Sequence, residues 1–258
     1  MDQGTVRFTR EGAIAHVVFD RPQARNAMTW TMYEQLAEIC ATIRADRTLR
    51  AATFRGAGGK AFIAGTDIHQ FQAFTTGEDG IAYEARIEAI LTGLETLPIP
   101  TLAVVDGWCV GGGLAIAACC DLRIGTPTAQ FGIPIARTLG NCLSTANYAR
   151  LVAELGVART KRILLMAEMI PAIEARDAGF LLDMAEPEAL DARVAEIATR
   201  LAGHAPVTMR VTKEAIRRIL AAVEVDGDDL VRECYGSNDF HEGVAAFVAK
   251  RPAEWTGS

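Results

Sequence analysis

The segment that decides the fold is residues 105–114, Val-Asp-Gly-Trp-Cys-Val-Gly-Gly-Gly-Leu. It follows a β-branched run and opens a run of small residues typical of a helix. Glycines at such a strand-to-helix turn permit positive φ angles and let a ligand approach the backbone closely. The first turn of a helix also carries unpaired N–H groups and a partial positive charge. The segment therefore predicts either a backbone oxyanion site or simple close packing of helix on strand.

A second glycine-containing loop occupies residues 60–68, Lys-Ala-Phe-Ile-Ala-Gly-Thr-Asp-Ile. It too follows an expected strand and precedes an expected short helix. Two backbone N–H groups that converge on one point, one from each loop, would stabilise an oxyanion. Asp67 has two interpretations, because it can cap the short helix that follows or take part in chemistry.

Other glycine-rich sites do not fit these loops. A dinucleotide fingerprint needs G-x-G-x-x-G with an acidic residue about 20 positions later, and the sequence lacks it. A phosphate-binding P-loop needs Gly-Lys followed by Ser or Thr, which is also missing. The sequence has no G-x-S-x-G nucleophile elbow. The loops therefore favour neither nucleotide phosphates nor a serine nucleophile.

Outward from these loops, short strands alternate with helices in the first half of the chain. This alternation predicts βα units in a mostly parallel sheet. The expected strands are 13–19, 51–55, 101–105 and 121–125, and the expected helices there are one capped by Thr29 that runs to about 43, one from about 81 to before Pro98, and one opened by 111–113. The later helices are expected at 145–155, 158–166, 173–178, 187–203, 207 to about 225, and 228 toward 250.

The overall pattern predicts a single functional unit with an α/β core at 1–200 and a helical region at 201–258. Its 258 residues are 50% hydrophobic and 22% charged, enough to bury a full core. Thirty-two acidic residues against 26 basic ones argue against nucleic acid or an anionic membrane as partner. The longest uncharged apolar stretch, 107–120, is too short and too glycine-rich to cross a bilayer.

The six cysteines form no C-x-x-C pair and have no histidine at ligand spacing. This usage is typical of free thiols packed in a reducing cytoplasm, and it predicts no metal site. The chain start shows no basic segment followed by an apolar one, so a cytoplasmic location is expected. The apolar faces of the late helices lack an obvious internal partner, which favours oligomerisation.

Several motifs together resemble the crotonase (enoyl-CoA hydratase/isomerase) superfamily. They occur in the family's order over nearly the whole chain. The first is 20–28, Asp-Arg-Pro-Gln-Ala-Arg-Asn-Ala-Met, and the others are 61–68, 106–113, 120–124, 130–132 and 239–251. The resemblance implies a spiral of ββα units with a C-terminal helical trimerisation region, assembled as a homotrimer or a dimer of trimers.

The resemblance also implies a coenzyme A thioester as substrate, with no separate cofactor. By carry-over, the N–H groups of Ala64 and Gly112 would hold the thioester oxygen. Ala24 and Arg25 would lie near the nucleotide, and Lys250 would reach CoA phosphates of a neighbouring subunit; a solvated surface charge is the alternative for both basic residues. The segment expected to receive the adenine-to-pantetheine stretch comprises Ala64, Gly65, Thr66, Asp67 and Ile68.

The sequence departs from the family's hydratases at two decisive positions. Those enzymes carry two glutamates that flank the acyl chain, and here the corresponding residues are Ala115 and Ile135. Addition of water needs one group that activates the water and one that delivers a proton to the α-carbon. Alanine and isoleucine can do neither, so hydration of crotonyl-CoA is expected to be weak or absent.

Cys142 is one candidate replacement. Residues 138–142 resemble the local pattern of the 4-chlorobenzoyl-CoA dehalogenase branch, in which an aspartate nucleophile stands at this position. A thiolate nucleophile would need a lowered pKa, for which Arg137 is close in sequence, and a packed thiol is the alternative. Asn141 can orient a water or a carbonyl but cannot act as a base.

Four titratable residues are further candidates. Glu84 and Glu88 share a helix face over the expected acyl pocket, although a solvated face is the simpler interpretation. His69 follows the second loop and can approach the CoA channel or simply lie on a helix surface. His16 falls within a strand, where a structural role is expected.

The sequence therefore predicts an acyl-CoA enzyme that stabilises a thioester enolate in an oxyanion hole. A decarboxylase, hydrolase or isomerase with a different acid/base set is the alternative, and a non-catalytic acyl-CoA-binding protein is another. An RNA-binding member of the family is a third alternative, and it would need a stripe of basic residues. The sequence offers only a diffuse stripe, formed by Arg44, Arg47, Arg50 and Arg55.

Overall fold

The computed structural model describes residues 3–222 and 225–258. The strands are β1 (Thr5–Glu11), β2 (Ile14–Asp20), β3 (Ala51–Gly56), β4 (Ala61–Ile63), β5 (Thr101–Val105), β6 (Trp108–Val110), β7 (Leu122–Gly125), β8 (Gln130–Gly132), β9 (Ile170–Pro171) and β10 (Asp183–Met184). The helices are α1 (Trp30–Ala45), α2 (Gly77–Glu95), α3 (Gly112–Ala118), α4 (Ile135–Thr138), α5 (Thr145–Leu165), α6 (Ala172–Asp177), α7 (Pro187–Ala202), α8 (Pro206–Ala221), α9 (Asp228–Tyr235) and α10 (Asn238–Ala249), with the 3-10 turns η1 (Pro22–Ala24) and η2 (Ile68–Ala73).

Two sheets organise the core. The larger has the order β1-β2-β3-β5-β7-β10 and the smaller the order β4-β6-β8-β9. Successive units each send their first strand to the large sheet and their second to the small one: β3 and β4, then β5 and β6, then β7 and β8. A helix follows each pair, so the chain advances by one strand in both sheets at every turn. This is the spiral of ββα units that the family resemblance implied.

The local signals for the main strands and helices are confirmed. The Thr29 side chain accepts a hydrogen bond from the Met32 amide at 3.3 Å and caps α1 as expected. The strand expected at 101–105 is β5, and 111–113 opens α3. Strands β5 and β7 pair in parallel, with Leu102 opposite Leu122.

The late helices differ from expectation in two places. Helices expected at 145–155 and 158–166 are joined in α5 across a kink at Gly156, where φ is 76°. The last expected helix is two, because Ser237 caps a new start by accepting from the Phe240 amide at 3.1 Å. The helix expected to reach about 225 is seen as α8, and its last residues, 223–224, lie outside the described residues. The boundary drawn at residue 200 falls within α7.

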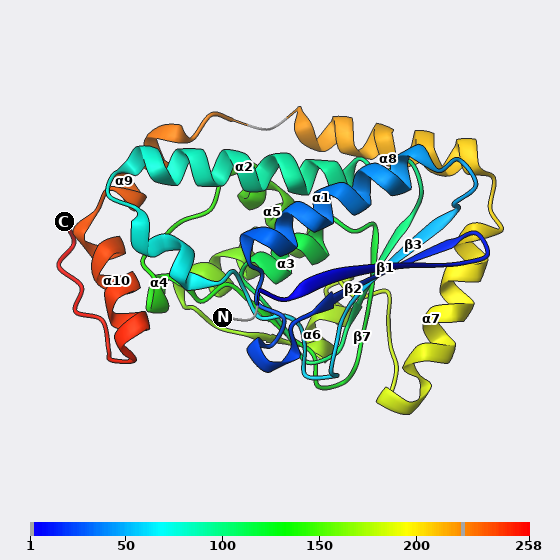
Figure 1. The fold of residues 1–258 in the computed structure, drawn as a ribbon, viewed down its shortest axis with the longest axis horizontal. Helices are drawn as coiled ribbons and strands as arrows, with labels where there is room; N and C mark the ends of the chain where they lie inside the picture. The colour runs from blue at the N-terminus through cyan, green and yellow to red at the C-terminus, as the bar shows by residue number, and fades with distance from the viewer. Residues whose placement is uncertain (1–2, 223–224) are drawn as a thin grey trace.

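The C-terminal helices pack back onto the α/β core at one end of the molecule, where Figure 1 shows α9 and α10 beside α2 and α4. The fit is close, because a Cβ on Gly80 of α2 would stand 2.2 Å from the Tyr235 ring of α9. Helix α8 behaves differently and buries none of its side chains. Within the described ranges, no helix combines the length and apolarity that a membrane span requires.

Candidate active site

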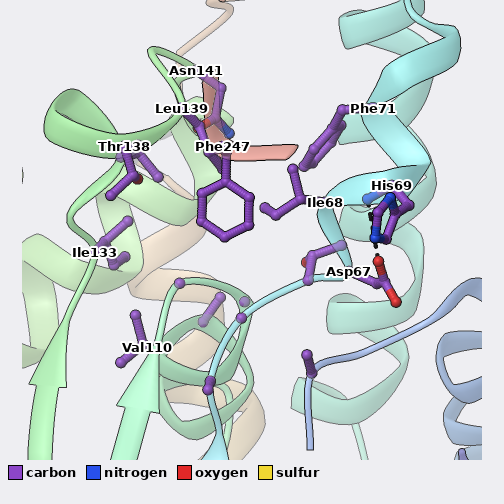
Figure 2. A pocket seen from close by; sticks show the side chains of 18 of the residues that line it. Asp67, Ile68, His69, Phe71, Val110, Ile133, Thr138, Leu139, Asn141 and Phe247 are labelled. Atoms are coloured by element: carbon purple, nitrogen blue, oxygen red, sulfur yellow. Dashed lines mark hydrogen bonds between the residues drawn. The ribbon is translucent and has the colours of Figure 1, made fainter. Parts of the chain in front are cut away.

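One cavity of about 730 Å³ lies where the two glycine loops, α2, α4 and α10 meet. That volume is within the usual range for small-molecule sites. Figure 2 shows Ile133 and Thr138 on one side and Ile68 and Phe71 on the other, with the ring of Phe247 between them. The residues singled out from the sequence that line it are Ala24, Ala64, Gly65, Thr66, Asp67, Ile68, His69, Glu84, Gly112, Ala115, Ile135, Asn141 and Lys250.

The two glycine loops converge inside this cavity. A Cβ on Gly111 would lie 3.5 Å from the Gly65 Cα, and one on Gly112 would lie 3.0 Å from the Thr66 hydroxyl oxygen. Gly112 is the first residue of α3, so its N–H has no carbonyl one turn earlier to bond. The loop glycines thus bring two stretches of backbone together around a helix N-terminus.

The expected role of the Ala64 amide is wrong. That N–H already donates to the Arg25 carbonyl oxygen at 3.0 Å, because the two segments run side by side. The backbone groups on either side of Thr66 are used by Met28. The Met28 N–H donates to the Gly65 carbonyl at 2.9 Å, and the Met28 carbonyl accepts from the Asp67 N–H at 2.8 Å. The Thr66 N–H between them has no backbone acceptor in the described part of the chain. Thr66, rather than Ala64, therefore offers the second free donor.

The motif at 20–28 fixes the Thr66 loop in place. Arg21 forms an ion pair with Asp67 at 2.8 Å, and both side chains are largely buried. Asp67 also accepts from the His69 amide at 3.1 Å, so it caps η2 as one interpretation expected. Asn26 adopts a positive φ of 59° and bonds the Arg21 amide and the Ala61 carbonyl through its side chain. These contacts hold the 20–28 segment against the Thr66 loop.

The cavity mouth carries the groups suited to a nucleotide. Lys250, at the C-cap of α10, lines the cavity of its own chain, and so does Ala24. Arg25 is exposed but does not line the cavity. His69 is exposed on η2, and its ring contacts the Gln72 side chain at 3.3 Å.

The opposite, inner end of the cavity is mostly apolar. Ala115 and Ile135, the two positions at which the hydratases carry glutamate, both line it. Its other apolar lining residues are Phe71, Ile87, Val110, Ile133, Leu139 and Leu143, and the half-exposed Phe247 also lines the cavity. We call this region the acyl end. A hydrocarbon chain entering past the glycine loops would meet these side chains.

Glu84 is the exception at the acyl end. Glu84 lines the cavity, although only 6% of its surface is exposed. Its Oε1 accepts from the Tyr235 hydroxyl at 2.7 Å and its Oε2 from the Ser144 amide at 3.0 Å. Burial raises the pKa of Glu84 to about 7, partly offset by these two hydrogen bonds. The solvated face expected for this side chain is therefore wrong.

Glu88 has a different environment, one turn along α2. Its carboxylate pairs with Arg150 of α5, with one contact at 2.8 Å, and it does not line the cavity. His16 is also outside the cavity and contacts the Thr53 hydroxyl in the large sheet at 2.8 Å. These two candidates have structural partners.

Cys142 does not line the cavity either. Its thiol contacts the Cys234 thiol, and this contact, with burial and the charge of Glu84, raises the pKa of Cys142. Arg137 is exposed, and it is not among the groups that shift the pKa of Cys142. The geometry therefore opposes a thiolate nucleophile and fits the packed thiol.

Sequence reasoning missed a group of tyrosines around the site. Tyr33 of α1 contacts the Thr66 hydroxyl at 2.8 Å, and Tyr83 of α2 donates to the same oxygen at 3.4 Å. Tyr235, from the other end of the chain, bonds Glu84. Tyr83 directly precedes Glu84, so a polar aromatic pair within an amphipathic helix was the one local signal available.

Comparisons with known proteins agree on one family. The model of the enoyl-CoA hydratase/isomerase family matches residues 9–258. A short-chain enoyl-CoA hydratase of Clostridium acetobutylicum is 31% identical over 98% of this chain and 98% of its own. The structure of an enoyl-CoA hydratase/carnithine racemase from Magnetospirillum magneticum is 35% identical, with a TM-score of 0.81 over 100% of this chain and 97% of that one. A methylmalonyl-CoA decarboxylase bound to 2-nitronate-propionyl-CoA is 25% identical, with a TM-score of 0.90 over 98% of both.

Proposed function

The chain belongs to the enoyl-CoA hydratase/isomerase family, and on that premise we propose that it binds an acyl-CoA thioester and stabilises its enolate. The enolate oxygen would sit between the Thr66 and Gly112 amides. The CoA moiety of the bound thioester would extend out through the mouth, past Ala24 and Lys250. The acyl group would occupy the acyl end. The protein acts without a separate cofactor in this proposal.

The observation that carries the proposal is the pair of free amides at the meeting point of two loops. Deprotonating a thioester next to its carbonyl places negative charge on the oxygen. Fixed N–H donors hold that charge without reorganising at the moment of reaction. Gly112 adds the partial positive charge of the α3 N-terminus. Thr66 is held there by the hydrogen bonds of its hydroxyl to two tyrosines.

The acid/base set of this site differs from the hydratase pair. Ala115 and Ile135 carry no proton, so the two-glutamate mechanism of water addition does not operate from those positions. We therefore propose a reaction that needs the enolate but few proton transfers, such as isomerisation or thioester-driven bond cleavage.

Decarboxylation is a second candidate, favoured by the similarity to methylmalonyl-CoA decarboxylase across the whole chain. Loss of CO₂ breaks the C–C bond and leaves its electron pair as the enolate, so no protein base is needed to form it. One proton is then taken up at the α-carbon. An apolar acyl end with a single carboxyl group suits that sequence.

Two measurements test the proposal in order. Isothermal calorimetry with crotonyl-, malonyl-, 3-hydroxybutyryl- and benzoyl-CoA, with free CoA alongside, measures binding. A product screen of the same thioesters by mass spectrometry then identifies the reaction. We expect at least one thioester to bind more tightly than free CoA and to turn over. No binding of any thioester would overturn the proposal, and binding without turnover would instead indicate an acyl-CoA-binding protein.

A further inference from the structure

The acyl end holds one carboxyl group, and its surroundings set it apart from every other carboxylate around the cavity. Asp67, at the mouth, is tied to Arg21 as an ion pair. Glu84 faces no cation among its described neighbours and is held by a hydroxyl and an amide instead. A carboxylate without a counter-charge in an apolar pocket is costly to ionise, so it exchanges its proton at a higher pH.

We propose that Glu84 is the catalytic acid/base of this enzyme and moves the proton at the α-carbon of the bound acyl group. The inference rests on the proposed function and deepens it, because it replaces the missing hydratase glutamates by a residue from another element, α2. One carboxyl group moves one proton at a time, which matches an isomerase or a decarboxylase better than a hydratase.

The hydrogen-bond network fixes the orientation of the Glu84 carboxyl group and allows both its neutral and its ionised form. The Asn141 side-chain amide donates to the Tyr235 oxygen at 3.3 Å, which leaves the Tyr235 hydroxyl hydrogen to point at Glu84 Oε1. The Ser144 amide holds Oε2 at 3.0 Å. Both bonds favour the ionised form, while burial favours the neutral form. Opposed influences of this kind keep both forms populated near neutral pH, as a general base requires.

Asn141 supplies a second observation at the same place. Its Oδ1 atom is buried and has no hydrogen-bond partner in the described part of the chain, although Asn141 lines the cavity. Buried carbonyl oxygens nearly always have a donor. A hydroxyl or water hydrogen that enters with the acyl group would satisfy it. A hydrogen-bond donor at this oxygen would join the network that links Asn141 to Glu84 through Tyr235.

The proton transfer balances without any further reactant. The ionised Glu84 takes the α-proton, so the Cα–H bond breaks and an O–H bond forms on the carboxyl group. The electron pair of the broken bond becomes the enolate double bond, and the carbonyl π pair moves to the thioester oxygen between the Thr66 and Gly112 amides. The reverse step returns the proton to carbon, at the same atom or at the γ-position in an isomerisation.

Other titratable groups interact electrostatically with Glu84 and contribute to the pH at which it exchanges its proton. Glu88 opposes its ionisation from the same helix, and the remaining groups are tyrosine hydroxyls and cysteine thiols. The neighbours that share an electrostatic interaction with Glu84 are Tyr33, Tyr83, Glu88, Cys142, Tyr148, Cys234 and Tyr235.

Deuterium exchange tests the proposal without assuming the reaction. Wild type and the Glu84→Gln variant are incubated in D₂O with butyryl-CoA and phenylacetyl-CoA, and exchange of the α-hydrogens is followed by mass spectrometry. Glutamine keeps the size of the side chain but cannot take a proton, and its single carbonyl oxygen can accept only one of the two hydrogen bonds that Glu84 accepts. We expect the Glu84→Gln rate to fall by ~10²–10⁴-fold, with thioester affinity within about threefold of wild type.

The matched control removes a carboxyl group from the same helix. Glu78 lies in the first turn of α2 and is paired with Arg232 on the surface, away from the cavity. Glu78→Gln should exchange at the wild-type rate. A Glu84→Gln rate within about threefold of wild type would overturn the proposal, as would wild-type protein that binds the thioesters but exchanges none. Wild-type protein that binds neither these two thioesters nor any thioester of the binding panel would instead overturn the proposed function.

Tyr235→Phe separates a proton-transfer role from a structural one. Without the Tyr235 hydroxyl, ionised Glu84 loses one donated hydrogen bond, so its pKa rises. The acidic limb of the exchange–pH profile should therefore move to higher pH, while the rate at high pH is largely recovered. A uniform loss across all pH values, with no shift of the limb, would contradict the assignment of Glu84 as the base.

Discussion

The two glycine loops and the acyl end share one cavity but are built by different means. In the proposed function the loops would act through the backbone N–H groups of Thr66 and Gly112, which the glycine turns place without any contribution from side-chain chemistry. The acyl end acts through side chains, and here those at positions 115 and 135 are apolar while Glu84 comes from a different helix. A backbone donor depends on the local turn that places it, whereas a side-chain group can be supplied to the same cavity from another element.

The largest expected effect is on the rate of crotonyl-CoA hydration by the wild-type protein, and it follows from the side chains of the acyl end. General acid–base groups each contribute ~10²–10⁴-fold to rate. Ala115 and Ile135 supply none, and Glu84 alone supplies one proton-transfer group rather than two. Crotonyl-CoA hydration, followed by loss of enoyl absorbance, should therefore be at least ~10²-fold slower than an ordinary enzyme rate. A kcat in the usual range would show that the site retains a full acid/base pair.

The next effect tests the two glycine loops by removing one donor. Gly112→Pro deletes the N–H at the first position of α3, where proline fits a helix. A Cβ there would meet the Tyr33 hydroxyl at 2.6 Å, so the change is made in a Tyr33→Phe background, with Gly112→Ala as the control that keeps the N–H. Relative to the alanine variant, proline should lower kcat by ~10²–10³-fold. Equal rates for the two variants would remove Gly112 from the oxyanion hole.

Much of the fold could be predicted because its signals are local. The Thr29 cap, the turn at 111–113 and the β-branched run of β5 each act within a few residues. The three-residue strands β4, β6 and β8 were missed, because they are too short for an alternating pattern to appear. Ala64 was assigned an incorrect role for a similar reason: only the structure shows that its N–H is used by the carbonyl of Arg25, 39 positions earlier.

The site was predicted less completely than the fold. The glycine loops were found because glycine is the one residue that permits both the turn and the close approach. Glu84 could be named but not placed, since its burial depends on Tyr235 and Ser144, which are distant in sequence. Amphipathic spacing cannot distinguish a helix face covered by solvent from one covered by a C-terminal helix.

A third prediction concerns entry of CoA past the loops. Gly65 has a φ of 119°, and a Cβ there would have only the Val110 carbonyl near, at 3.9 Å, so a larger side chain projects into the cavity. Gly65→Val should weaken acyl-CoA binding at least about tenfold by calorimetry, a loss of about 1.4 kcal/mol. Gly179→Val, at a φ of 80° on the surface, carries similar backbone strain outside the cavity and should bind normally. Unchanged affinity in folded Gly65→Val would oppose the pantetheine path.

A fourth prediction concerns assembly and lies outside both regions. Helix α8 buries none of its side chains, yet Val211, Ile216 and Ile219 are each more than half exposed. An apolar helix face of that kind is typical of a subunit interface. We expect a trimer or hexamer by light scattering at micromolar concentration, and Ile219→Glu should weaken it. A monomeric wild-type protein under those conditions would reject the expectation.

The smallest effect is expected at Cys142, and it decides how the acyl end works. If its thiolate were the nucleophile, Cys142→Ser would abolish turnover, because a neutral hydroxyl is a far weaker nucleophile. The structure argues otherwise: the thiol is outside the cavity, and contact with Cys234, burial and the charge of Glu84 all raise the pKa of Cys142. A thiol with a raised pKa stays protonated at neutral pH and does not attack a thioester. We therefore expect Cys142→Ser to retain turnover within about twofold and to lose at most ~1 kcal/mol of stability. A loss of more than tenfold in kcat, with thioester affinity intact, would return the nucleophile to Cys142 and leave Glu84 with a purely electrostatic role.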